Sequence, residues 1–382
     1  MLALKDIVFK DLTSPRELQH VLTNHPKSIK KSLGQHYLID KNIVRKITAL
    51  IETTTSIAKA STQATQIIEI GAGLGTLTAS LLSTSTQSRI IAIEVEQTSA
   101  HLLKNNINPN TVSIVSTPKD LRTAPPPALM IITADVFAYP WPTLLQALAG
   151  HKITFVGNLP YRIATRLIIY LLENYAFLTY DMVFMVQREV AQKLTATPSF
   201  SPPPSQSTLN KATQNSTPKK TPTTHSTARG TYGVATLLIT WHATVRCHFS
   251  VSPNSFYPKP KITSQIISIK PKPDLTTQTV SITSIDPTTT HQVPQKQLYP
   301  LFKQIIKTAF SKRRKTIQNA LHTIEPDKKL LTQRLLTANI DPKSRPEQLS
   351  LAAYTHLATL FYSPTEPKHA QTHSSSPISY PP

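Results

Sequence analysis

The chain has 382 residues, which is enough for two domains, and its 39% hydrophobic residues and 32 prolines indicate irregular sequence around a core. Its 41 Lys and Arg against 20 Asp and Glu give a net charge of +21, which implies a polyanionic partner, either nucleic acid or an anionic membrane surface. One cysteine, Cys247, excludes an internal disulfide and argues against a zinc site. No apolar run reaches the ~18 residues of a membrane span, and no secretory signal is evident. We therefore expect a cytoplasmic protein directed to nucleic acid rather than to a membrane.

Residues 1–29 form an N-terminal extension with one short predicted helix. Ser14 is a cap residue, Pro15 suits the first helical position, and Glu17 stands three residues after the cap. The following stretch, KKSLGQHYLID at 30–40, combines basic residues with a glycine turn and an aromatic ring. It could guide a phosphate backbone, but the residues alone favour a solvated lead-in to a helix near residues 42–51.

A glycine-rich turn follows the strand predicted at Ile67–Ile70. The chain has eight glycines, and three of them, Gly71, Gly73 and Gly75, lie within five positions before a helix at 76–82. This density indicates a tight turn that lets a ligand approach the backbone closely. The spacing G-x-G-x-G differs from the dinucleotide fingerprint G-x-G-x-x-G and lacks the Lys of a phosphate-binding P-loop. A strand-turn-helix without a ligand is the alternative.

Two acidic residues end the next predicted strands. The strand at 89–93 ends in Glu94, 19 positions after Gly75, where a carboxylate can accept hydrogen bonds from both ribose hydroxyls. Residues 108–128 are expected to be an inserted loop in which only 112–115 resembles a strand. The strand at 128–133 then leads to Asp135, which could accept from an adenine amino group or be an ordinary turn residue, with Val136 as an apolar wall.

The stretch FVGNLPYRIATRL at 155–167 places a polar and aromatic cluster on a strand-to-helix turn. A strand is predicted at 153–156 and a helix at 163–172, so Asn158, Pro160 and Tyr161 lie at the carboxyl end of a strand, where open α/β sheets bind ligands. An amide, a stiff turn and a ring suit an exocyclic amine on a base. A loop with a buried Tyr is the alternative. With a fifth strand at 182–186, the alternating pattern predicts a parallel, doubly wound α/β sheet.

The second half of the chain alternates between low-complexity and ordered segments. Residues 195–230 are expected to be a disordered insert, followed by strands at 234–249 and 262–269. The connection between these strands, SFYPKPK, holds Phe256 and two lysines, and is either the rim of a base-binding pocket or a rigid hairpin. After a linker at 273–295, residues 296–362 form a small helical domain, and 363–382 an unstructured tail.

The helical domain is strongly basic. Residues 301–346 contain eleven basic and three acidic residues. Lys312, Arg313, Arg314 and Lys315 are consecutive within the helical apolar stripe, and such cations repel one another unless an anion is near. The cluster predicts a phosphate-binding surface, with a solvated basic face as the alternative.

Seven motifs taken together resemble one family, the S-adenosylmethionine-dependent ribosomal RNA adenine N6-dimethyltransferases. In order they are KKSLGQHYLID, IIEIGAGLG, IAIEVE, ADVF, VGNLPYRIATRL, SFYPKPKITS and AFSKRRKTIQNAL, and they cover about residues 30–361. The last motif distinguishes this group from the 23S ribosomal RNA resistance methylases. The resemblance implies a Rossmann-like class I methyltransferase sheet at 30–272 and a small C-terminal helical domain that binds RNA.

The resemblance also implies site residues. Contacts to S-adenosylmethionine would be made by His36, Leu38, Gly71, Gly73, Glu94, Asp135 and Asn158, with His36 standing where the family often has Asn. Asn158 and the Pro160 carbonyl would hold the adenine amine, and Tyr161 and Phe256 would stack on the base.

The expected activity is dimethylation of two adjacent adenosines near the 3′ end of small-subunit ribosomal RNA, by a monomer acting on a pre-30S particle. The alternative is a non-catalytic RNA-binding ribosome assembly factor. A nicotinamide dehydrogenase lacks the required glycine spacing.

Overall fold

The computed structural model describes residues 12–24, 35–56, 66–84, 89–107, 112–125, 127–175, 180–198, 232–272, 279–283 and 290–362. Two compact units, Met1–Thr276 and Thr277–Pro382, make up the chain. Residues 199–230 of the predicted insert and the tail at 363–382 lie outside the described residues.

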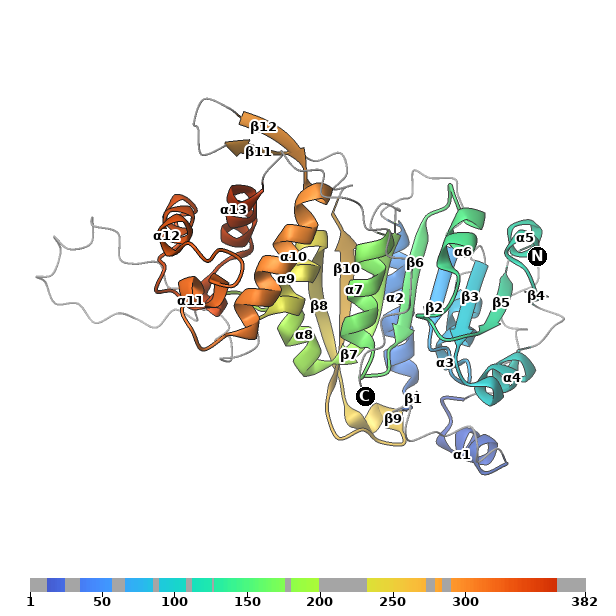
Figure 1. The fold of residues 1–382 in the computed structure, drawn as a ribbon. Helices are drawn as coiled ribbons and strands as arrows, with labels where there is room; N and C mark the ends of the chain where they lie inside the picture. The colour runs from blue at the N-terminus through green and yellow to red at the C-terminus, as the bar shows by residue number, and fades with distance from the viewer. Residues whose placement is uncertain are drawn as a thin grey trace, which may run out of the picture. The chain divides into compact units, whose positions relative to one another are not determined.

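An eight-stranded sheet forms the centre of the first unit (Figure 1). Its order is β4 (Ser113–Val115), β5 (Ala128–Thr133), β3 (Arg89–Glu94), β2 (Gln66–Ile70), β6 (Ile153–Asn158), β7 (Tyr180–Gln187), β10 (Ser264–Pro271) and β8 (Ala243–Val251). Neighbours from β4 to β7 are parallel, whereas β10 is antiparallel to both β7 and β8. The predicted parallel part is therefore confirmed, and the two antiparallel strands make the whole sheet mixed.

Helices cover both faces of the sheet. One face packs against α2 (Lys41–Ser56), α3 (Thr76–Thr84) and α4 (Gln97–Asn106), and the other against α5 (Pro118–Thr123), α6 (Trp141–Ala147), α7 (Ala164–Tyr175), α8 (Arg188–Leu194) and α9 (Val234–His242). Side chains alternate along β2, so Ile67 joins the first layer while Ile68 joins the second. Strands covered on both faces have long apolar runs, which is why the sequence identified them.

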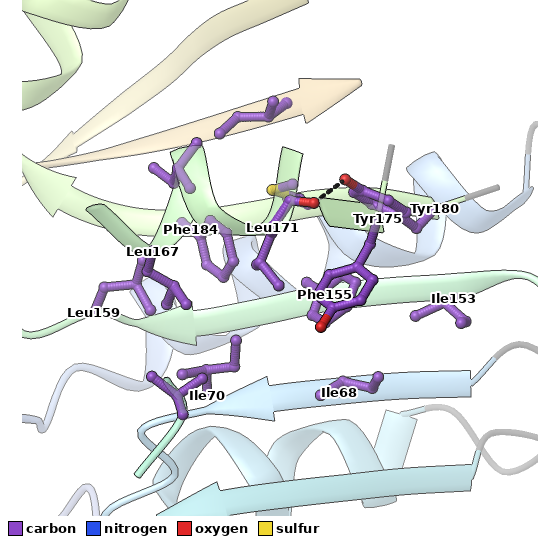
Figure 2. Packing of buried hydrophobic residues seen from close by; sticks show 14 of the residues in the cluster. Ile68, Ile70, Ile153, Phe155, Leu159, Leu167, Leu171, Tyr175, Tyr180 and Phe184 are labelled. Atoms are coloured by element: carbon purple, nitrogen blue, oxygen red, sulfur yellow. Dashed lines mark hydrogen bonds between the residues drawn. The ribbon is translucent and has the colours of Figure 1, made fainter. Parts of the chain in front are cut away.

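The core on the α7 face is packed around Phe155 of β6 (Figure 2). Phe155 is fully buried between Ile68 and Tyr180, and the Tyr180 hydroxyl donates a hydrogen bond of 3.1 Å to the Leu171 carbonyl. Truncating a buried Phe to Ala costs roughly 3–5 kcal/mol. This packing fixes the end of β6, and with it the turn that follows.

Two secondary-structure predictions for the first unit are wrong. Residues 234–249 are not one strand, because 234–242 form α9; nearly every side of this helix is buried, and a continuous apolar run does not distinguish a buried helix from a strand. The predicted loop at 108–128 contains α5, where the Thr117 side chain accepts from the Asp120 amide and Pro118 starts the helix. The short N-terminal helix is confirmed as α1 (Pro15–Asn24).

The second unit is a hairpin followed by helices. Strands β11 (Thr279–Thr283) and β12 (Thr290–Pro294) pair antiparallel, so the segment predicted as a linker contains a hairpin. Helices α10 (Gln295–Ser311), α11 (Ile317–Leu321), α12 (Lys328–Thr337) and α13 (Leu351–Phe361) follow, with the 3-10 turn η6 (Pro346–Gln348). Phe302 and Tyr354 are fully buried among them.

Among the described residues, no helix is long and apolar enough to cross a membrane. The same residues contain no cluster of three or more His, Cys, Asp and Glu side chains arranged to hold a metal ion.

Candidate active site at the carboxyl edge of the sheet

Four parallel strands bring the predicted site residues to one edge of the sheet. β2 ends at the glycine turn, β3 at Glu94, β5 just before Asp135, and β6 at Asn158. The strands are in register, with Ile70 beside Ile93 and Glu94 beside Thr133. Gly71 and Asn158, 87 positions apart in the sequence, therefore lie at the same edge, as expected for an α/β ligand site.

The glycine turn requires its glycines. Gly71, Gly73 and Gly75 all have positive φ, at 75°, 58° and 95°. A Cβ on Gly71 would lie 3.7 Å from the Asn158 carbonyl oxygen and 3.8 Å from Pro160 Cδ. The glycine turn and the Asn158–Tyr161 turn thus face each other, and one carbon added to Gly71 would be in van der Waals contact with the second turn.

Glu94 is held by the backbone. Its Oε2 accepts from the Gly73 amide at 2.8 Å and its Oε1 from the Glu96 amide at 3.0 Å, and the residue is 4% exposed. Burial raises the pKa of the Glu94 carboxyl, although these backbone hydrogen bonds lower it. Carboxylate oxygens have about four acceptor positions, so Glu94 retains capacity for hydroxyl donors.

Two side chains beside Glu94 offer complementary contacts. Asp135 is exposed, and its Oδ1 accepts from the Phe137 amide at 2.8 Å. Val95 is 54% exposed although it is a large apolar residue. The sequence analysis did not single out Val95; the signal that could have found it is an apolar residue placed directly after the strand-end acid.

The orientation of the Asn158 amide is set by His36. Asn158 Nδ2 donates to the His36 carbonyl oxygen at 2.9 Å. A carbonyl oxygen only accepts hydrogen bonds, so it selects the amide nitrogen and directs Asn158 Oδ1 elsewhere. This contact joins residues 122 positions apart, and the sequence analysis, which placed His36 with the cofactor, did not predict it.

Rings flank the Asn158 turn. His36 and Tyr161 have ring centroids 5.8 Å apart at an interplanar angle of 32°. His36 Nδ1 lies 2.7 Å from the Pro258 carbonyl oxygen, so Nδ1 carries the proton, and the Tyr161 hydroxyl lies 3.0 Å from Ser264 Oγ. Burial raises the pKa of Tyr161. Both rings are therefore anchored at their polar ends.

Two motifs over 200 residues apart form one small sheet. β1 (Tyr37–Leu38) pairs antiparallel with β9 (Phe256–Tyr257), which follows the 3-10 turn η5 (Pro253–Ser255). The Ser255 hydroxyl donates to Asp40 Oδ2 at 2.9 Å, while Asp40 Oδ1 caps α2. Tyr37 and Leu38 are buried, so the interpretation of this stretch as a solvated lead-in is wrong for them.

Two predicted roles meet structural constraints. Phe256 is 3% exposed and packs in the same core cluster as Leu38, so it presents no open face in this conformation, and its stacking role stays a prediction. The Pro160 carbonyl already accepts from the Ile163 amide at 3.0 Å and has one further lone pair for an amine. The exposed ring on β9 is that of Tyr257, at 38%.

The basic cluster of the second unit lies in a turn, not within a helix as predicted. α10 ends at Ser311, and Thr316 caps the start of α11 by accepting from the Asn319 amide. Lys312, Arg314 and Lys315 are exposed. Arg313 is half-buried and forms an ion pair with Glu347, so one of the four cations has a partner within the chain.

Comparisons with known proteins find relatives that match most of the chain. The chain is 28% identical over 329 residues to ribosomal RNA small subunit methyltransferase A of Pseudomonas aeruginosa, covering 86% of this chain and 93% of that protein. It is 30% identical over 330 residues to the protein of the same name from Acidithiobacillus ferrooxidans, covering 86% and 93%.

A dimethyladenosine transferase from Plasmodium falciparum shares the fold, with a TM-score of 0.53 at 18% identity over 84% of this chain and 96% of that one. The sequence model of the ribosomal RNA adenine dimethylase family matches residues 26–362, which is most of the chain. The chain therefore belongs to the ribosomal RNA adenine dimethylase family.

Proposed function

We propose that the chain methylates N6 of two adjacent adenosines near the 3′ end of small-subunit ribosomal RNA, twice each, with S-adenosylmethionine as methyl donor. Its family makes it an S-adenosylmethionine-dependent ribosomal RNA adenine dimethyltransferase. The small-subunit target is supported by the names of its relatives. We further infer that it acts as a monomer in the cytoplasm, on a pre-30S particle, with a role in small-subunit biogenesis.

The edge of the sheet fits S-adenosylmethionine. Glu94 would accept from the ribose hydroxyls, Asp135 from the adenine amine, and the exposed side chain of Val95 would contact the adenine ring. The positive-φ glycine turn carries no Cβ, so a ligand could approach its backbone closely. When bound, this cofactor supplies a methyl group on a positively charged sulfur.

The chain's own residues would prepare the adenine amine. The N6 lone pair is delocalised into the purine ring, so the amine is a weak nucleophile. Asn158 Oδ1 and the Pro160 carbonyl would accept its two N–H bonds, which orients the nitrogen and stabilises the positive charge that develops on it. Tyr161 would stack on the flipped base, worth ~1–3 kcal/mol. The product loses its proton readily to water, so no strong general base is required.

One observation supports this role most directly: the hydrogen bond from Asn158 Nδ2 to the His36 carbonyl. It commits the amide nitrogen to the protein, and leaves the amide oxygen as the acceptor that an amine needs. The test is methylation of small-subunit RNA by Asn158→Ala, followed by mass mapping of the modified adenosines. Asn174→Ala is a matched control, because Asn174 is exposed on α7. Near wild-type methylation by Asn158→Ala, with folding and cofactor affinity intact, would reject the assignment.

A non-catalytic assembly factor remains the second candidate, and the exposed cations of Lys312, Arg314 and Lys315 favour RNA binding in either case. Titration with S-adenosylmethionine separates the two. Binding that is lost in Glu94→Ala supports the enzyme, and the absence of any binding supports the assembly factor.

A further inference from the structure

Helix α1 has an apolar face that belongs to the same buried cluster as Leu74 of the glycine turn. It lies before residue 26, where the match to the family begins. Leu18, Val21 and Leu22 follow helical spacing and are 0%, 8% and 5% exposed. With Leu12 they form a cluster with Leu74 of the turn; its remaining members are Tyr37 and Leu102.

Leu74 is the large side chain of the glycine turn, and it is 1% exposed. Its carbonyl accepts from the buried Asn106 Nδ2 at 3.2 Å, so the residue is held at its backbone by α4 and at its side chain by the α1 cluster. The neighbouring Gly73 faces the Tyr37 ring, whose Cε1 would lie 3.2 Å from an added Cβ. Tyr37 belongs to the same cluster as α1.

This packing reaches the proposed cofactor site through one residue. Gly73, adjacent to Leu74, donates its amide to Glu94 Oε2 at 2.8 Å. Three positive-φ glycines give the turn more conformational freedom than residues with a Cβ would, so the turn depends on its neighbours to populate one conformation. If a ligand binds only that conformation, its apparent Kd is the intrinsic Kd divided by the fraction of molecules in that conformation.

We propose that α1 is a positioning element for the cofactor: by burying Leu74 it holds the glycine turn in the conformation in which Gly73 anchors Glu94. The proposal rests on the proposed function for its ligand, S-adenosylmethionine. Leu18, the most buried residue of the α1 face, is the central positioning residue. It touches neither cofactor nor RNA in this role, and acts through Leu74.

The test uses the full chain and three variants. Leu18→Ala removes the contact, Gln19→Ala changes the adjacent exposed residue of the same helix, and Leu171→Ala makes the same truncation in the core on the other face of the sheet. Calorimetric titration gives the Kd for S-adenosylmethionine well below the melting temperature. Hydrogen exchange without ligand measures the protection of the Gly73 and Gly75 amides. These amides donate to Glu94 and to the Ala72 carbonyl, so their protection reports the conformation of the turn.

We expect Leu18→Ala to raise the Kd by roughly tenfold and to speed exchange at Gly73 and Gly75, with RNA affinity unchanged. Gln19→Ala and Leu171→Ala should leave the Kd within twofold of the wild type. An unchanged Kd and unchanged exchange in Leu18→Ala would overturn the proposal, and so would equal increases in Leu18→Ala and Leu171→Ala, since these would report general destabilisation.

The exchange measurement separates this proposal from the proposed function. If the wild type binds no S-adenosylmethionine, the proposed function fails, and faster exchange at the turn in Leu18→Ala still decides whether α1 holds the turn. If Leu18→Ala does not fold, Val21→Ala makes a smaller truncation in the same cluster and is judged by the same two measurements.

Discussion

The site of the first unit and the basic turn of the second unit are built in opposite ways. Around Asn158 and Glu94, buried and half-buried polar atoms are fixed by hydrogen bonds of 2.8–3.0 Å with backbone groups of His36, Gly73 and Glu96. In the basic turn, Lys312, Arg314 and Lys315 are exposed, and among the described residues only Arg313 has an ion-pair partner. We expect the first site to select one ligand geometry, and the second to bind phosphate through charge with little geometric selection.

The difference predicts different responses to substitution. A fixed buried group acts in a medium of low effective dielectric, so the loss of one atom is felt strongly. Exposed cations are screened by salt and contribute in small, roughly equal portions. Single substitutions should therefore have large effects at the first site, and only combined substitutions should matter at the second.

The largest effect is expected at Asn158. Asn158→Ala should lower kcat/KM for RNA methylation by roughly 10²–10³-fold, the usual cost of losing one preorganised group at a reacting centre. Cofactor affinity should change much less. The measurement is single-turnover methylation on small-subunit RNA, with Asn174→Ala as control. Loss of cofactor binding to the same extent would mean that Asn158 acts on the cofactor and not on the amine.

Glu94 should have the next largest effect, on the cofactor alone. Glu94→Ala should raise the Kd for S-adenosylmethionine by about 100-fold, because charge-assisted hydrogen bonds are each worth roughly 1.5–3 kcal/mol. RNA affinity should not change. Calorimetric titration checks both ligands, and Glu189→Gln, an exposed acid on α8, is the control. A Kd within threefold of the wild type would place the ribose elsewhere.

Glu69 is a buried carboxyl on β2, two residues before Gly71. Its titration measures how strongly burial acts next to the first site. The Thr78 hydroxyl donates to Glu69 Oε2 at 2.6 Å, and burial raises the pKa of Glu69 to about 8. The stability that comes from this raised pKa is fully present below the unfolded pKa of about 4.5. It is lost as the pH rises toward 8. The free energy of unfolding of Glu69→Gln, measured relative to that of the wild type, should therefore rise by about 2 kcal/mol between pH 5 and pH 7.

Urea unfolding followed by tryptophan fluorescence measures this shift. The only two tryptophans, Trp141 and Trp241, are both buried in the first unit, so the signal reports that unit. Parallel pH profiles for the wild type and Glu69→Gln would show that Glu69 is ionised in the fold.

The smallest effect per residue is expected in the basic turn. Replacing Lys312, Arg314 and Lys315 with Gln should weaken RNA binding roughly tenfold at moderate salt. The slope of log K against log salt is negative, and it should become less steep by ~0.7–0.9 per lost phosphate contact. The triple replacement of Lys328, Lys329 and Lys343, exposed cations of the same unit, is the matched control. An unchanged slope would show that the turn is a solvated face. Arg313→Gln is tested separately, because it also breaks the pair with Glu347.

The sequence by itself determined the framework of the first unit. Apolar runs placed β2, β3, β5, β6 and β7, since strands covered on both faces must be apolar throughout. Gly71, Glu94, Asp135 and Asn158 could be assigned to one edge because parallel strands end on the same side. Local signals failed where they were ambiguous, as at 234–242, or where composition concealed a cap, as at Thr117.

Only the tertiary structure decided which distant residues touch. The hydrogen bond from Asn158 to the His36 carbonyl, the β1–β9 pairing and the α1 cluster around Leu74 join segments with no common local pattern. Burial of Phe256 and the Arg313–Glu347 pair likewise depend on how the chain closes on itself. Periodicity reports which face of an element is buried, but the partner that covers this face is selected by packing across the whole fold.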